Sequence, residues 1–167
     1  MDRVELPNPK KPSFPYEPGF QISIQAHKPP APFGRLYRPD PRSKSRKSPN
    51  ELRKLTQSQY VSDNLPLESD ADALKSERAT LSIIKPIAAR DSRGAQLVLC
   101  DIEPHDDNNK YRAVAKIYDA LYYPFWGGED QREPLDVVYQ ADKDYTWEAA
   151  AYDHLNANAK LVEAVGE

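Results

Sequence analysis

The clearest alternation of hydrophobic and polar positions lies in residues 110–119, KYRAVAKIYD. A period of two is typical of a β-strand, whose successive side chains point to opposite faces. The polar run at 107–109 and Pro124 bound the segment, as turn residues bound a strand. One face then carries Tyr111, Ala113, Ala115 and Ile117, and the other carries Arg112, Val114, Lys116 and Tyr118. The pattern therefore predicts a strand with Lys116 well inside it.

Residues 144–155 follow a different period, which is typical of a helix that begins near Asp142 or Asp144. Its core-facing stripe, at i, i+3, i+4, i+7 and i+10, consists of Tyr145, Glu148, Ala149, Tyr152 and Leu155. A carboxylate on such a stripe is costly to bury unless a cation faces it. We therefore expect Lys116 to pair with Glu148. The alternative is that Lys116 reaches solvent along its alkyl chain while Glu148 is exposed on a differently phased helix.

Two further apolar runs, 80–87 and 95–102, read as strands joined by a turn at 91–94. Three strands with short connections predict an antiparallel meander. With the helix, residues 79–167 form an α+β unit of three strands and one helix. The connection at 122–134 is rich in aromatic residues that are unfavourable in water, so they either fold back on the strands or meet a protein partner: Tyr122, Tyr123, Phe125 and Trp126.

Residues 1–78, which we call the leader, contain 11 of the 16 prolines within the first 50 positions. Proline removes backbone donors and favours extended conformations, so the leader is predicted to be a disordered, proline-rich and basic region. Within it, residues 42–49 (RSKSRKSP) form a basic cluster. This cluster is either a segment for nuclear import or for an acidic partner, or a solvated charge run.

The net charge of -3 is unevenly distributed, because the leader has 14 Lys/Arg against 10 Asp/Glu, whereas residues 79–167 have 9 against 16. A folded part this acidic argues against nucleic acid as a partner. Cys100 is the only cysteine and the three histidines are scattered, so no metal site is predicted. With no signal-like or membrane-spanning stretch, we expect an intracellular protein, cytoplasmic or nuclear, that is not secreted and does not enter a membrane.

Three segments, 94–100 (GAQLVLC), 113–123 (AVAKIYDALYY) and 148–152 (EAAAY), resemble the start of the fungal protein-kinase-like domain family. The resemblance covers the chain from about residue 79 onward. It implies an ATP-binding amino-terminal lobe in which Lys116 contacts the phosphates and Glu148 orients Lys116. It also implies that Gly94 lies in the phosphate-covering turn and that Val114 borders the adenine slot. In such a lobe, residues 19–25 would lie across the lobe; otherwise they are an apolar spot in a disordered segment.

The chain departs from an active kinase in two respects. The turn at 88–95 has one glycine in place of a Gly-x-Gly-x-x-Gly loop, with Arg90 and Arg93 as substitute charges. No His-Arg-Asp or Asp-Phe-Gly segment occurs, so neither a catalytic nor a metal-binding residue is predicted.

We therefore expect a truncated, pseudokinase-like protein with weak or residual ATP binding and no phosphotransfer alone. Mg²⁺ would bind only if the missing carboxy-terminal lobe were supplied. The alternative is a non-enzymatic interaction module whose disordered leader recruits partners.

Overall fold

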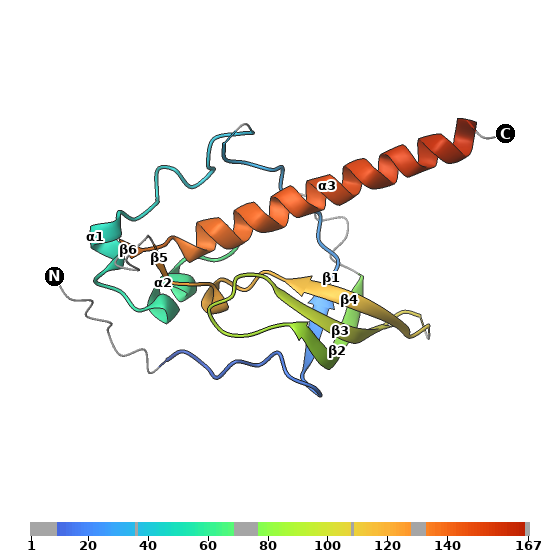
Figure 1. Ribbon diagram of the computed structural model, residues 1–167, viewed down its shortest axis with the longest axis horizontal. Coiled ribbons are helices and arrows are strands. Elements are labelled where there is room, and N and C mark those ends of the chain that lie inside the picture. Colours follow the sequence, from blue (N-terminus) through green and yellow to red (C-terminus); the bar gives the residue numbers. More distant parts are fainter. Residues whose placement is uncertain (1–9, 36, 69–76, 108, 128–132, 166–167) are drawn as a thin grey trace.

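The computed structural model describes residues 10–35, 37–68, 77–107, 109–127 and 133–165, with side chains described as far as residue 157. Its centre is a four-stranded antiparallel sheet with the strands in sequence order (Figure 1). The strands are β1 (Gln21–Gln25), β2 (Arg78–Ala88), β3 (Gln96–Pro104) and β4 (Tyr111–Ile117). The α+β class is confirmed, and so are the three predicted strands.

The remaining elements lie at one end of this sheet, except for a long helix that starts there and runs past the sheet. They are the helices α1 (Pro49–Leu52), α2 (Gln57–Asp63) and α3 (Val137–Val165), a 3₁₀ turn η2 (Ala120–Tyr122), and a short ladder of β5 (Trp126–Gly127) with β6 (Glu133–Pro134). Among the described residues, no helix combines the length and the apolar character that a bilayer span requires.

The sheet has one strand more than predicted, because β1 pairs with β2 from Gln21 opposite Ser82 to Gln25 opposite Arg78. Residues 19–25 therefore belong to the sheet and are not an apolar spot in a disordered segment. The alternation seen in the sequence is real, but its pairing partner lies more than fifty residues away, beyond any local signal.

The helix also begins earlier than predicted, at Val137 and not near Asp142 or Asp144. The carboxylate that caps it is Asp136, whose Oδ1 accepts the backbone N–H of Tyr139 at 2.9 Å. The first turn is stabilised by packing, since Val137, Val138 and Ala141 are buried against the aromatic residues that follow η2.

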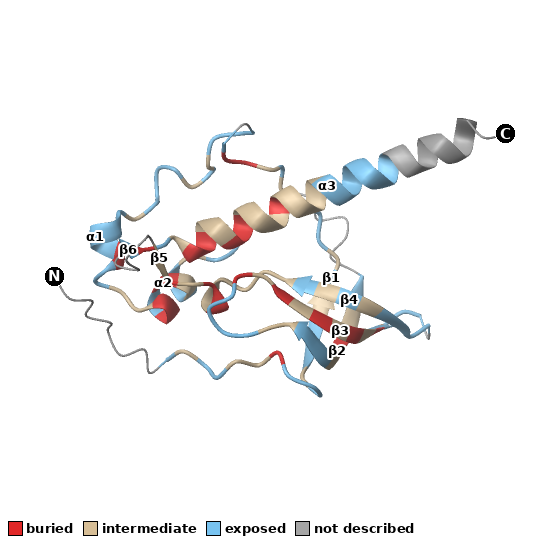
Figure 2. Cartoon of the chain, viewed as in Figure 1, coloured by how far each residue is buried: buried red, intermediate tan, exposed pale blue. Residues whose placement is uncertain are grey.

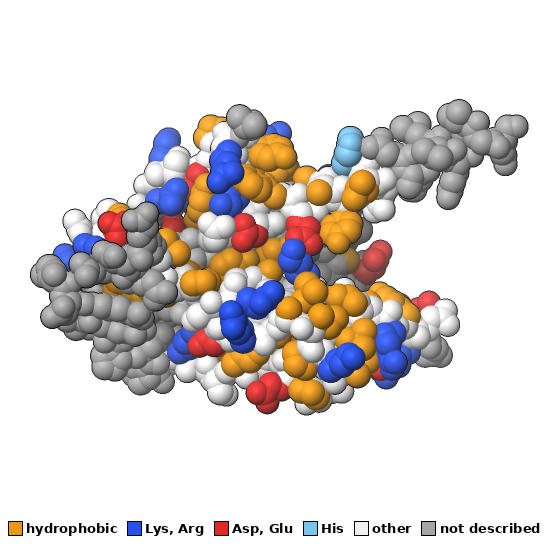
Figure 3. Space-filling model, viewed as in Figure 1, with side chains coloured by type: hydrophobic (Ala, Val, Ile, Leu, Met, Phe, Trp, Pro, Cys, Tyr) orange, Lys and Arg blue, Asp and Glu red, His pale blue; other side chains and the backbone are white. Residues whose placement is uncertain are grey.

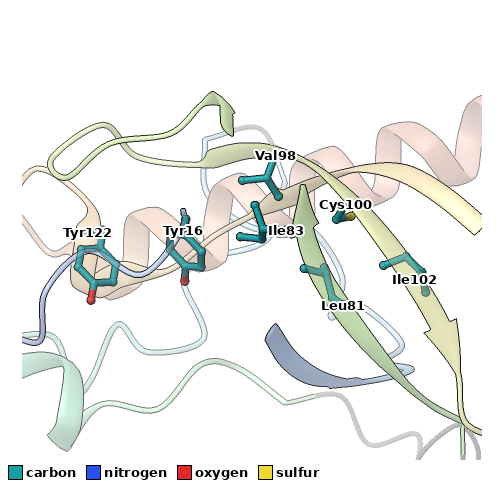
Figure 4. Packing of buried hydrophobic residues seen from close by; sticks show 7 residues of the cluster. All are labelled: Tyr16, Leu81, Ile83, Val98, Cys100, Ile102 and Tyr122. Atoms are coloured by element: carbon teal, nitrogen blue, oxygen red, sulfur yellow. The ribbon is translucent and has the colours of Figure 1, made fainter. Parts of the chain in front are cut away.

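One face of the sheet forms the main core, in which β2 and β3 contribute Leu81, Ile83, Val98, Cys100 and Ile102 (Figure 4). Tyr16 and Tyr122 complete this cluster from outside the sheet. The rings of Tyr16 and Tyr122 meet edge to face, with centroids 5.8 Å apart. Tyr16 also donates a hydrogen bond of 2.6 Å to Asp119 Oδ2, at the residue that caps η2.

The described part of the leader is folded, contrary to the prediction that residues 1–78 are disordered. Phe14, Tyr16 and Phe20 cover the core face, and Leu52 and Tyr60 are buried in a second cluster beneath α3. Prolines prevent regular structure in this stretch but do not prevent its aromatic side chains from packing. Positions 1–9 and 69–76 of the leader lie outside the described residues.

The aromatic residues of the connection do not await a partner. Tyr122, Tyr123 and Phe125 are buried and Trp126 is partly buried, all by other parts of this chain. Of the two predicted alternatives, the structure shows the one in which these residues fold back within the chain. The aromatic residues fold back on the strands and on α3, which removes their apolar area from water.

The predicted apolar stripe of α3 is only half correct (Figure 2). Tyr145, Glu148 and Ala149 are partly buried, but Tyr152 and Leu155 are exposed where the helix diverges from the sheet (Figure 1). The carboxy-terminal half of α3 therefore projects away from the rest of the molecule.

We predict that Tyr16→Ala lowers the free energy of unfolding by about 3–5 kcal/mol, the usual cost of deleting a large buried aromatic side chain. The substitution removes the ring that packs against the core face, and it removes the hydrogen bond from the Tyr16 hydroxyl to Asp119. Urea unfolding followed by tyrosine and tryptophan fluorescence measures the change. The matched control is Tyr37→Ala, an exposed tyrosine of the same leader, which should cost about 0.5 kcal/mol or less. Equal effects of the two substitutions would contradict the proposed role of Tyr16.

Candidate functional site

The expected contact between strand and helix is present. Lys116 on β4 and Glu148 on α3 form an ion pair through Nζ and Oε2. Their side chains are 38 % and 29 % exposed, so the pair lies at the edge of the molecule, in contact with solvent. Of the four predicted site residues, these two are the ones that the structure brings into direct contact.

Tyr118 is a third member of this site that the sequence did not reveal. Its hydroxyl donates a 2.6 Å hydrogen bond to the same Oε2 of Glu148. Alternation had put Tyr118 on the Lys116 face of the strand, two residues further on, but nothing in the pattern linked it to Glu148. With a cation and a phenol on one oxygen, the Glu148 carboxylate is fixed in orientation.

These contacts set the protonation behaviour of the site. Partial burial raises the pKa of Glu148, but the hydrogen bonds from Lys116 and Tyr118 and the charge of Lys116 outweigh it, so the pKa lies below its ordinary value. Burial, and then the bond to Glu148, raises the pKa of the Tyr118 phenol. Burial also raises the pKa of Asp144, against the opposing effects of Lys143, its hydrogen bonds and Lys116. At neutral pH the site therefore holds a charged pair and a neutral phenol.

Lys116 points to the sheet face opposite the core, which we call the open face. In the β3–β4 register Leu97 faces Lys116 and Leu99 faces Val114, so these side chains share that face. Both leucines are partly buried, and Val114 is 58 % exposed. Figure 3 shows hydrophobic side chains gathered over the sheet beside α3, with Lys and Arg side chains around them. Val114 thus lies on the same face as Lys116 but is not enclosed in a slot.

The turn between β2 and β3 lies at the Lys116 end of the sheet, since Ala88 pairs with Leu97. Its conformation is fixed from within by Gln96, which donates to the carbonyl of Gly94 and accepts from the backbone N–H of Arg90, both at 2.8 Å. Gly94 is buried with φ +101°, and a side chain there would meet the Tyr123 ring at 3.8 Å. The turn and its packing against Tyr123 account for the glycine at this position. That Gly94 also lets the backbone come close to a phosphate stays a prediction.

Lys116 also lines a cleft of about 680 Å³ between the end of β4, the first half of α3 and residues 61–68. Its walls are largely apolar or aromatic, among them Ile117, Val138 and Tyr145. Its carboxylates, from Glu68, Asp119 and Asp142, outnumber its one lysine, Lys116. Among the described residues, no group of three or more His, Cys, Asp or Glu side chains is arranged to hold a metal ion.

Comparisons of this chain with protein-family models, with curated proteins and with solved structures gave no match. The resemblance to the fungal kinase-like family therefore stays a prediction based on the three sequence segments that carry it.

The lowered pKa of Glu148 predicts how Glu148→Gln depends on pH. A carboxylate whose folded-state pKa is depressed stabilises the protein above its unfolded value of 4.5, and this stabilisation is lost as the pH falls through the lower folded value. The variant should be less stable than the parent by about 0.5–1 kcal/mol at pH 7, as is usual for partly exposed pairs. This difference should shrink towards zero in acid. Urea titrations between pH 7 and pH 3 measure it, and a difference independent of pH would contradict the assignment.

Proposed function

We propose that the chain from about residue 79 onward acts as the amino-terminal, ATP-binding lobe of a protein-kinase-like domain, with Lys116 as the cation that contacts the phosphates of ATP. The observation that carries the proposal is the Lys116–Glu148 pair across a strand–helix junction. A flexible lysine is a poor ligand until a neighbouring group holds it, and Glu148, itself bonded by the Tyr118 hydroxyl, does so here. The kinase arrangement uses the same two residue types on the same two kinds of element.

Electrostatics favour the open face over the cleft as the side from which phosphates approach. The cleft presents Asp119 and Glu68, which repel a polyphosphate, although Arg42 neutralises Asp142 at 2.7 Å. The open face has Lys116 with Lys85 opposite Leu99, and the nearby turn adds the exposed Arg90 and Arg93. Two carboxylates lie at the same end, Asp91 and Glu148, and each is paired with a lysine, so the cations there outnumber the anions.

The same face offers apolar area for the base. Leu97, Leu99 and Val114 form a half-exposed strip beside Lys116. An adenine ring laid on it would be covered on one side only, and buried area is what most small ligands rely on for affinity. We therefore propose weak ATP binding by this chain alone, without phosphotransfer. A carboxy-terminal lobe would have to cover the base and bring the carboxylates that bind Mg²⁺.

We predict that millimolar Mg-ATP raises the melting temperature of the parent protein by about 1–3 °C, because a ligand near its Kd adds only a fraction of a kcal/mol. Lys116→Met should abolish the shift, since the apolar side chain fills similar space but offers no charge to phosphate. Glu148→Gln should reduce the shift, because it leaves Lys116 charged but less firmly held. Differential scanning fluorimetry measures all three proteins.

The matched control is Lys54→Met, which removes an exposed lysine outside the sheet and should leave the shift intact. AMP in place of ATP tests for the phosphates, because it retains the base and should give a smaller shift. The proposal fails if the parent shows no shift, or if Lys116→Met and Lys54→Met behave alike.

A further inference from the structure

The basic cluster of the leader lies on α3. We call residues 35–47 the basic strap; residue 36 lies outside the described part of the chain. The indole N–H of Trp147 on α3 donates a 2.6 Å hydrogen bond to the carbonyl of Phe33, two residues before the strap. Further along, Arg42 pairs with Asp142 at 2.7 Å and Arg46 with Asp136 at 3.2 Å. The strap therefore runs beside the first half of α3, as Figure 1 shows.

The bend that begins the strap depends on a glycine. Gly34 has φ +81°, and a side chain there would lie 2.9 Å from the hydroxyl of Tyr139 on α3. Only glycine allows this close approach without displacing the helix side chain. The position of the strap against α3 therefore depends on glycine at residue 34.

Docking leaves this surface strongly positive. The strap contains six Lys/Arg residues and one acidic residue, Asp40. Three acidic side chains nearby, Asp40, Asp136 and Asp142, are at most 9 % exposed and are engaged by Arg42 and Arg46, while the exposed Glu68 lines a small pocket together with Arg38. Five other cations form no ion pair within the part of the chain that the structure describes: Arg35, Arg38, Lys44, Lys47 and Lys143.

Aromatic rings lie among these cations. Tyr37 is 57 % exposed, and its ring centroid is 5.7 Å from that of Trp147. The Arg35 guanidinium lies 6.0 Å from the Trp147 ring centroid and the Lys143 ammonium 5.2 Å from it. Figure 3 shows Lys and Arg side chains next to hydrophobic ones beside the first half of α3. Exposed rings within a cationic surface are the combination that binds single strands.

We propose that the basic strap and the first half of α3 form a binding surface for single-stranded nucleic acid. Arg35, Arg38 and Lys44 contact the phosphates, and a base stacks on Tyr37. An acidic peptide would satisfy the cations but would leave the exposed Tyr37 ring without a role. The acidity of residues 79–167 predicted that nucleic acid does not bind. The structure places the leader's cations on α3, so the charge of this surface includes both parts of the chain. This surface is distinct from the Lys116 site and does not depend on the proposed nucleotide binding.

The experiment is a fluorescence-anisotropy titration of the full chain with dye-labelled oligouridylate and oligothymidylate of about 12 nucleotides, within the usual range of a single-strand site. We expect saturable binding whose logarithmic salt dependence has a negative slope. Removing two phosphate contacts with Arg35→Ala/Arg38→Ala should lower the magnitude of that slope by about 1.4, at about 0.7 for each contact. Tyr37→Ala should weaken binding by roughly 5- to 100-fold, the effect of losing one stacked base, and should leave the slope unchanged.

The matched control is Lys85→Ala/Arg93→Ala, which removes two exposed cations from the sheet side and should leave binding within about twofold, as surface changes distant from a contact do. Thermal melts of every variant verify folding, and Tyr37→Ala perturbs no buried group. Three outcomes would each overturn the proposal: no binding by the parent, equal binding of a duplex of the same length, or equal binding of polyglutamate that Tyr37→Ala does not weaken. Loss of binding in the sheet-side control, with none in the strap variants, would also overturn it.

Discussion

A β-sheet with one apolar face must have that face covered, and in this protein the leader covers it. Phe14, Tyr16 and Phe20 lie over the strands, where each large side chain removed from water contributes about 1.5–3 kcal/mol. The Tyr16 hydroxyl also bonds to Asp119, which caps the 3₁₀ turn immediately after β4. The cover therefore also fixes the path by which the chain leaves the strand that carries Lys116.

The opposite face has no such cover, and its chemistry differs for that reason. Lys116 and Glu148 meet where both remain partly exposed, so their attraction is screened by water and adds little to stability. The pair matters for orientation. Lys116 and Tyr118 both donate to one oxygen of Glu148, which fixes that carboxylate and, through it, the Lys116 ammonium. The molecule thus separates its roles, with stability on the core face and charge on the open face.

Local pattern was sufficient to predict the three strands and the contact between Lys116 and Glu148, because periods of two and 3.6 fix which side chains share a face. It was not sufficient for the leader. Proline frequency indicates the absence of regular structure, but whether Tyr16 or Leu52 packs depends on a surface formed far along the chain. The predicted start of α3 near Asp142 or Asp144 is too late for a similar reason, since the first turn is stabilised by the packing of Val137 and Val138 against residues far from it in the sequence. Tyr118 was on the predicted face, yet its partner could not be identified without coordinates.

The second half of α3 projects from the molecule, so a tilt of the helix near Glu148 is amplified at its far end. From residue 149 to residue 165 the backbone extends about 24 Å at a rise of 1.5 Å per residue. Because a helix is stiff over this length, a tilt of about 10° near Glu148 would displace the free end by roughly 4 Å over that span. A change in the tilt of α3 at Glu148 would therefore move the distant end of the helix much further than it moves Glu148 itself.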